Sequence, residues 1–162
     1  MFYLRIITGF AYLIRGKVKN GILILTPFFA PNVGGVETHL NDLTAYLAEE
    51  GYYTYILTYK PITSKINAPY FTKTRNLEIS RLPWFGFNLF SKLEPFPILE
   101  FLYITPWLLI NAFIFLLFKK NFIKVIHAQG LNSAFIGALL KVIFRKRLVV
   151  STHRDEPIFF YG

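Results

Sequence analysis

The chain has 162 residues, which is enough for one domain with a substantial core and leaves no room for a second domain of usual size. Lysine and arginine outnumber aspartate and glutamate by 18 to 9, and the formal net charge of +9 favours an anionic ligand or surface. Cysteine is absent, which excludes disulfides, zinc–thiolate sites and thiol nucleophiles, and the 54% hydrophobic content indicates apolar surface beyond a normal core.

The amino-terminal segment, residues 1–20, is both apolar and basic. Its apolar run, Ile6 to Ile14, is too short to span a bilayer and is followed by Arg15, Lys17 and Lys19. A secretory signal peptide has its main basic residues before the apolar region, so we do not expect a cleaved signal. An interfacial helix is the leading interpretation, and a helix packed on the domain is the alternative.

Residues 21–51 predict a strand, a glycine-containing loop and a helix. The unbroken apolar run Ile22 to Leu25 suits a strand that is buried on both faces of a parallel sheet. An apolar stripe with helical spacing follows, formed by Val36, Leu40, Leu43 and Leu47. Gly51 is expected to end this helix.

The loop in this unit contains Gly34 and Gly35, whose backbone N–H groups can approach a ligand closely because no side chain intervenes. The positive end of the helix dipole lies at the same place, so the loop is a candidate phosphate site, with an ordinary tight turn as the alternative. Because Val36 and Glu37 follow directly, the loop is neither a GxGxxG dinucleotide fingerprint nor a P-loop.

The middle of the chain predicts two more strands and one ambiguous segment. Tyr53–Tyr59 and residues 76–82 alternate as strands do, and the polar stretch between them, residues 61–75, is expected to be a loop. In the apolar stretch that follows, Pro97 and Pro106 are expected to interrupt any helix, and the clean part is shorter than the ~20 residues of a membrane span. Three interpretations stay open: a span, an interfacial surface, or a buried crossover helix.

The last third repeats the pattern of the first. Residues 125–128 predict a strand, residues 134–144 a helix capped by Asn132 or Ser133, and residues 148–152 a last strand. Strands alternating with helices predict an α/β fold in which helices cover both faces of a parallel sheet. Ligands of such sheets bind beyond the carboxyl ends of the strands, where the chain places three polar clusters: residues 32–37, 127–133 and 153–156.

Two long segments carry a resemblance to a known family. TPFFAPNVGGVETHLNDLTAYLAEEGYYTYILT and, later, KVIHAQGLNSAFIGALLKVIFRKRLVVSTH resemble the amino-terminal domain of family 4 glycosyltransferases over residues 21–154. The resemblance implies a Rossmann-like half of a GT-B fold, in which this domain holds the acceptor and a second domain across a cleft grips a nucleotide-sugar donor. We therefore expect residues 21–162 to form the acceptor-side domain, with the donor domain absent from these residues.

The resemblance also implies roles for individual residues. Gly34 and Gly35 would place backbone amides near the donor phosphates without a metal, and no cofactor is expected. His127 and Gln129 match a strand-end pair of histidines near the sugar and the acceptor, and are the expected catalytic residues. Gln129 can bond to a sugar hydroxyl but cannot shuttle a proton. The other acceptor or cleft residues implied by position are Asn32, Glu37, Asn132, Ser133, His153 and Arg154.

The leading hypothesis is a retaining glycosyltransferase that works peripherally at the cytoplasmic face of the cell membrane. It would use a nucleotide sugar and a lipid-linked or polysaccharide acceptor, and the isolated chain is expected to be inactive until a donor domain, such as one on a separate chain, completes it. The alternative is a noncatalytic membrane-associated subunit that binds an anionic glycolipid or a partner chain. A nucleic-acid role is not favoured, because the basic residues are dispersed among apolar runs.

Overall fold

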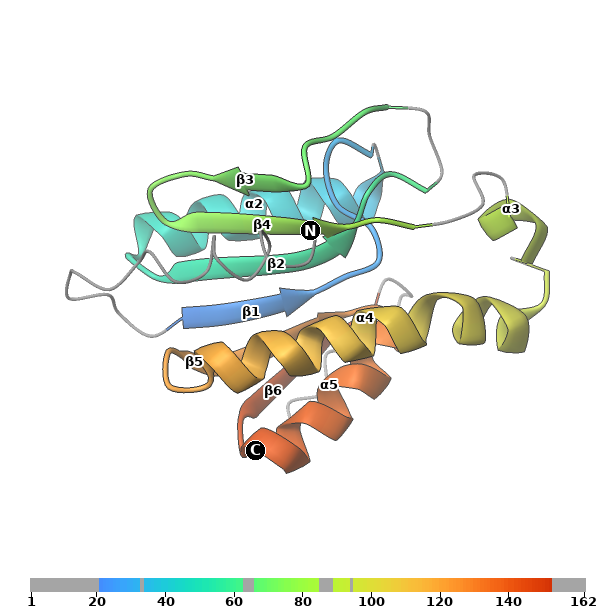
Figure 1. Cartoon of the computed structure of the whole chain (residues 1–162). Coiled ribbons are helices and arrows are strands. Elements are labelled where there is room, and N and C mark those ends of the chain that lie inside the picture. Colours follow the sequence, from blue (N-terminus) through green and yellow to red (C-terminus); the bar gives the residue numbers. More distant parts are fainter. Residues whose placement is uncertain (1–20, 33, 63–65, 85–88, 94, 153–162) are drawn as a thin grey trace, which may run out of the picture.

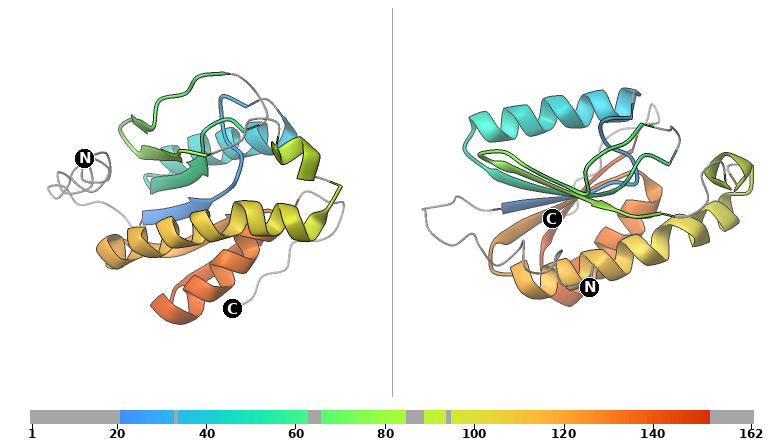
Figure 2. Two further views of the ribbon diagram at one scale, coloured as in Figure 1. Left: turned by 45° about the vertical axis from the view of Figure 1, so that its right-hand side comes forward. Right: turned by 45° about the horizontal axis from the view of Figure 1, so that its top comes forward.

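The computed structural model describes residues 21–32, 34–62, 66–84, 89–93 and 95–152. The amino-terminal segment and two predicted cleft residues, His153 and Arg154, lie outside these residues. One six-stranded sheet has the strand order β3-β4-β2-β1-β5-β6, and all neighbouring pairs are parallel except β3 with β4. Helix α2 covers one face, and α4 and α5 cover the other (Figures 1 and 2). This arrangement confirms the predicted α/β fold with helices on both faces.

The centre of the sheet is formed by β1 (Gly21–Leu25), which pairs with β2 (Tyr53–Tyr59) on one side and β5 (Ile123–Gln129) on the other. Every residue of β2 is buried, because layers of side chains cover both of its faces. Its tyrosines and Leu57 pack toward α4, whereas Ile56 packs toward α2. The two strands predicted for this part of the chain are confirmed.

Helix α2 (Gly35–Glu49) is held on the sheet by its apolar stripe. Leu40 is fully buried against Ile24 and Ile56, with Val36 and Leu43 at the sides of the contact. Gly51, at a φ of 78°, ends the helix as predicted, because a left-handed residue there lets the following amides turn back to the last carbonyls.

The predicted loop of residues 61–75 is wrong in its last part. It contains the short strand β3 (Phe71–Lys73), which pairs antiparallel with β4 (Leu77–Leu82) and forms one edge of the sheet. β3 is mostly exposed, so it carries no apolar alternation that a sequence pattern could detect. The segment is a strand only because it forms hydrogen bonds with β4. β4 itself confirms the predicted third strand.

The ambiguous segment forms the short helix α3 (Leu89–Leu93) and the 23-residue helix α4 (Pro97–Lys119). Pro97 occupies the first turn, where its missing N–H costs nothing, but the predicted interruption at Pro106 is wrong. Pro106 lies on the exposed face of α4, so the carbonyl it leaves unpaired is not forced into the core. The opposite face of α4 is fully buried at Ile104, Leu108, Ala112 and Leu116. α4 is therefore the crossover between β4 and β5, and it also has the length and apolar composition of a membrane span.

Helix α5 (Leu131–Phe144) and strand β6 (Arg147–Ser151) complete the sheet. The predicted start of this helix is wrong: it begins three residues earlier, and neither Asn132 nor Ser133 caps it. Gly130, at φ 82° and ψ 169°, turns the chain directly from β5 into α5 in a conformation that is essentially restricted to glycine. Gly137 then lets α5 approach closely, because a Cβ there would lie 2.6 Å from Leu148 Cδ1.

Candidate functional site

Those predicted site residues that the structure describes lie at the carboxyl edge of the sheet. From β1 the chain passes through α2 to β2 and then β4 on one side of β1, whereas β5 and β6 lie on its other side. The strand order therefore reverses between β1 and β5. Open α/β sheets bind ligands in the crevice at such a switch point. The loop after β1, the ends of β5 and β6, and the first turn of α5 all reach this edge.

His127 lies at the end of β5 on the face of the sheet that α2 covers, in register with Ile24 of β1. It is 7% exposed, and its Nε2 lies 2.9 Å from Ser151 Oγ at the end of β6. Ser151 is in register with Gln129, so the three side chains lie together across two strands. The structure thus brings together two predicted site residues and adds Ser151.

Burial lowers the pKa of His127 to about 4, and the charge of His39 on α2 lowers it further. The imidazole is therefore uncharged at neutral pH, with one ring nitrogen that can donate and one that can accept a hydrogen bond. Such an acidic imidazolium makes His127 a weak base near neutral pH. The neutral ring of His127 is therefore better suited to orienting a hydroxyl group by hydrogen bonds than to accepting its proton.

Gln129 and Ser133 add buried polar atoms to the same edge. Gln129 is 3% exposed and Ser133 is fully buried. Among the described residues, neither Gln129 Oε1 nor Ser133 Oγ has a hydrogen-bond partner. Buried polar atoms are seldom left unpaired, since each costs free energy, so these two oxygens mark places for a ligand or an ordered water. Asn132, the neighbouring predicted residue, is only half-buried.

The glycine loop lies at the start of α2, as predicted. Gly34 is the N-cap residue, and no side chain caps the first amides from that position. However, the carboxylate of Glu37 in the first helical turn folds back over it: a Cβ on Gly34 would lie 2.6 Å from Glu37 Oε2. A carboxylate at this helix end is stabilised by the helix dipole. Glu37 thus holds a negative charge where a donor phosphate is predicted, and its side chain must turn away if a phosphate binds.

Arg81, near the end of β4, fixes the loops around the crevice, and the sequence patterns did not reveal it. Its guanidinium donates to the carbonyl of Ala30 at 2.8 and 3.3 Å, to Pro69 O at 3.3 Å and to Thr72 Oγ1 at 2.9 Å. Asn32, a predicted cleft residue, follows Ala30 in the loop held by Arg81 and is buried. The only signal in the sequence was a cation within an apolar strand.

No group of three or more His, Asp or Glu side chains within the described parts of the chain is arranged to hold a metal ion. Apart from the Glu37 carboxylate, the predicted polar groups that the structure places at this edge are imidazole, amide, hydroxyl and backbone amide groups. These groups donate and accept hydrogen bonds without a fixed charge, which is the chemistry needed to orient a polyhydroxylated ligand.

Comparisons with known proteins agree with this geometry. Residues 33–162 match the family described as Glycosyltransferase Family 4. Sucrose-phosphate synthase from Thermosynechococcus elongatus has a similar fold, with a TM-score of 0.55 at 19% identity over 84% of this chain. A second structure of that enzyme gives 0.54 at 17% identity over 83% of this chain and 64% of its own. This chain spans 33% of the first of these structures. No curated protein sequence matches the chain.

Proposed function

This chain belongs to glycosyltransferase family 4, and from that premise we propose that it forms the acceptor-side wall of a retaining glycosyltransferase. The enzyme would transfer a sugar from a nucleotide-sugar donor to a lipid-linked or polysaccharide acceptor. A donor domain, in the same protein or on a separate chain, would complete the cleft. The observation that carries the proposal is the uncharged cluster formed by the buried His127 and Gln129 with the half-buried Ser151 at the switch point of this fold.

The cluster and the glycine loop would have separate tasks. His127 and Gln129 would hold the reacting sugar and the acceptor hydroxyl in place by hydrogen bonds, which contributes to rate by positioning. The amides of Gly34 and Gly35 at the start of α2 would stabilise the negative charge that develops on the departing diphosphate, without a metal or cofactor. The Glu37 side chain would swing aside as the donor enters.

The test is sugar transfer by the full chain supplied with a family 4 donor domain, using a panel of sugar nucleotides and lipid-linked acceptors. We expect transfer, and we expect Gln129→Leu to lower kcat/KM about tenfold or more by removing a buried hydrogen-bonding amide of similar size. Asn41→Ala on the exposed surface of α2 is the control. A chain that binds glycolipid but transfers no sugar in any combination would instead be the noncatalytic subunit.

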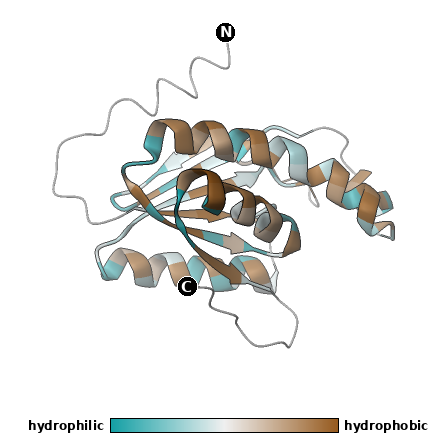
Figure 3. Cartoon of the chain, turned by 90° about the horizontal axis from the view of Figure 1, so that it is seen from below, coloured by the Kyte–Doolittle hydropathy of each residue, from teal (hydrophilic) through white to brown (hydrophobic). Residues whose placement is uncertain are grey.

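The proposed location, the inner face of the cell membrane, rests on the exposed side of α4 and α5. Both helices are mostly apolar in the view from below (Figure 3). Side chains that the sheet does not cover include Ile98 at 76%, Leu131 at 76% and Val142 at 77% exposure. Many large apolar side chains exposed on two neighbouring helices are typical of a membrane or protein contact.

Charge favours a lipid surface as the occupant. Residues 101–152 contain no aspartate or glutamate, and their cations other than the buried Lys119 gather where α4 and α5 end: Lys120, Lys124, Lys141, Arg145, Lys146 and Arg147. Partial burial lowers the pKa of Lys146, and the like charges of Lys124 and Lys120 lower it further by repulsion. Anionic head groups would relieve this repulsion while the apolar side chains enter the acyl boundary. Gly21, which follows the basic residues 1–20 in the sequence, lies at this same edge, since its N–H donates to Phe122 O at 2.9 Å.

A further inference from the structure

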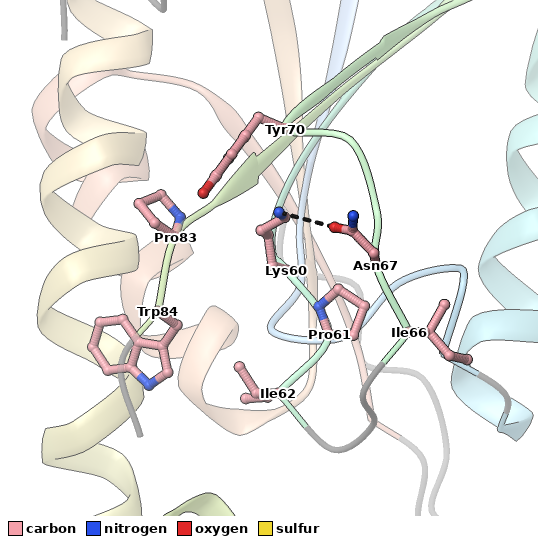
Figure 4. A pocket seen from close by; sticks show the side chains of 8 residues that line it. All are labelled: Lys60, Pro61, Ile62, Ile66, Asn67, Tyr70, Pro83 and Trp84. Atoms are coloured by element: carbon pink, nitrogen blue, oxygen red, sulfur yellow. Dashed lines mark hydrogen bonds between the residues drawn. The ribbon is translucent and has the colours of Figure 1, made fainter. Parts of the chain in front are cut away.

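A pocket of about 380 Å³ opens at the carboxyl edge of the sheet, beside the switch point. Its walls come from the loop after β2 and from the two residues that follow β4, Pro83 and Trp84. Figure 4 shows Tyr70, Pro83 and Trp84 on one side, with Asn67 opposite and Lys60 between them. None of the sequence patterns pointed to this pocket.

The pocket combines apolar and aromatic walls with the polar side chains of Asn67 and Lys60, and Lys60 is the cation among its lining residues. Lys60 Nζ lies 3.9 Å from the centre of the Tyr70 ring and 3.4 Å from Asn67 Oδ1. Both partners are neutral, and no carboxylate lines the pocket. The ammonium group therefore has no carboxylate partner among the lining residues and has donors available for an anionic group that enters.

Trp84 links the pocket to the exposed apolar face of α4. Its ring packs against Tyr59 and against Tyr103 of α4, with centroids 4.8 Å apart in both pairs. Leu99 lies one helical turn before Tyr103, and it and Leu102 are exposed. A ligand can therefore have an anionic group at Lys60 and an apolar tail along the start of α4, which is the face proposed to meet the membrane.

Resting on the proposed function, we propose that this pocket binds the phosphate-bearing head of a lipid-linked acceptor. Lys60 binds the phosphate, the ring of Tyr70 or Trp84 covers the apolar face of the sugar, and the lipid runs along Leu99 and Leu102. β1 alone separates β2, which Lys60 follows, from β5, which Gln129 ends. Two strand spacings amount to about 10 Å, so a sugar attached to that phosphate would have to cross the carboxyl end of β1 to meet His127 and Gln129, which face α2.

The experiment measures binding of three probes to the full chain by tryptophan fluorescence: farnesyl diphosphate, farnesol and uridine diphosphate. We expect farnesyl diphosphate to bind more tightly than farnesol. Lys60→Met should weaken farnesyl diphosphate about tenfold and leave farnesol unchanged, while Lys60→Arg should bind as the wild type does. Asn67→Asp should also weaken it, because a carboxylate beside the ammonium competes with the phosphate. Lys92→Met, which removes an exposed cation of α3 outside the pocket, is the matched control.

The outcomes separate this inference from the proposed function. If Lys60→Met and Asn67→Asp bind farnesyl diphosphate as the wild type does, the pocket assignment is overturned and the transferase proposal stands. If uridine diphosphate displaces farnesyl diphosphate, the pocket serves the donor and the assignment is again overturned. Lys60-dependent binding by a chain that transfers no sugar with any donor domain would overturn the transferase proposal and retain the pocket.

Discussion

His127 and Gln129 stand two residues apart on β5 and face the same side of the sheet, yet burial affects their chemistry differently. Gln129 has no proton to gain or lose near neutral pH, so burial leaves its amide able to donate and accept hydrogen bonds. Burial makes the imidazole of His127 a neutral group with a similar hydrogen-bonding capacity. If Gln129 stands where the family has a histidine, as the resemblance implies, the change suits a crevice in which neither residue transfers a proton.

A first prediction concerns the pH dependence of stability. The pKa of His127 falls from 6.5 to about 4 on folding, so its contribution is complete above pH 6.5 and is lost as the pH falls toward 4. The full shift corresponds to about 3 kcal/mol of unfolding free energy. His127→Gln should therefore lose less stability than the wild type between these values in urea unfolding. If the free energies of unfolding of the two proteins changed in parallel with pH, the imidazole of His127 would not be buried in its neutral form.

A second prediction tests the glycine loop. Gly35→Asp adds a negative charge at the exposed first position of α2, where an acidic side chain favours the helix, so the fold should be kept. Donor-dependent transfer by the complemented enzyme should collapse, because the carboxylate repels the donor phosphate. Gly35→Asn, whose side chain is of similar size but neutral, should lose less of the transfer activity. Normal turnover by folded Gly35→Asp would show that the loop is an ordinary turn.

At the scale of elements, Arg81 on β4 acts as a clamp between two loops. Its guanidinium joins the loop after β1, at Ala30, to Pro69 and Thr72 beyond β2. The planar fork of an arginine reaches several acceptors at fixed angles, which a lysine cannot do. The clamp therefore sets the position of the crevice loops without contacting the predicted ligands.

A third prediction follows for this clamp. Arg81→Met should lower the free energy of unfolding by about 2–4 kcal/mol, because it removes a buried guanidinium that donates to two partly buried carbonyls and to Thr72. Arg81→Lys should restore only part of this loss, and Arg75→Met, an exposed arginine nearby, serves as the control. Urea unfolding measures all three, and a change at Arg81 no larger than the one at Arg75 would contradict the clamp.

A fourth prediction concerns the apolar face of α4 and α5. The wild type should float with vesicles that contain anionic lipids, and high salt should weaken this only in part, since apolar burial is insensitive to screening. Ile98→Glu combined with Val142→Glu should reduce binding about tenfold or more without unfolding, because both side chains are exposed. Tyr46→Glu on α2 is the matched control on the opposite face. If the double variant floated as well as the wild type, this face would not be the one that contacts the membrane.

At the scale of the whole molecule, the crevice has one wall. The sheet presents His127, Gln129, Ser151 and the start of α2 along one edge, and α2 faces away from the apolar side proposed to contact lipid. An acceptor anchored in a membrane could therefore lie along α4 while its reactive end reaches the carboxyl edge. A donor needs a second wall to hold its nucleotide base and ribose.

The fifth prediction is that these 162 residues alone transfer no sugar at a measurable rate. Positioning an acceptor hydroxyl against the donor and stabilising the leaving diphosphate both require preorganised groups on two sides of the substrate. The assay uses the purified chain with radiolabelled sugar nucleotides and lipid-linked acceptors, with and without an added donor domain. Robust transfer without the added domain would refute the one-wall arrangement.

The sequence by itself determined the order of the main elements and where ligands meet the sheet. The pattern of apolar residues predicted β1, α2, β2, β4, β5 and β6. Each of these elements buries one or both faces, so its apolar residues follow the period of the backbone. Polar residues at strand ends then pointed to the carboxyl edge, since all strands in a parallel sheet finish on the same side. The position of His127 and Gln129 at the end of one strand was enough to predict that they lie together.

Only the tertiary structure decided the features that depend on contacts between distant segments. β3 exists because β4 offers an unpaired edge, and α4 passes through Pro106 because its other face is held in the core. The bonds of Arg81 and the pocket around Lys60 join loops that follow different strands, and no local pattern records which loops will meet. Hydrophobic period is a property of one segment, whereas loop contacts arise only once the sheet has set the strand order.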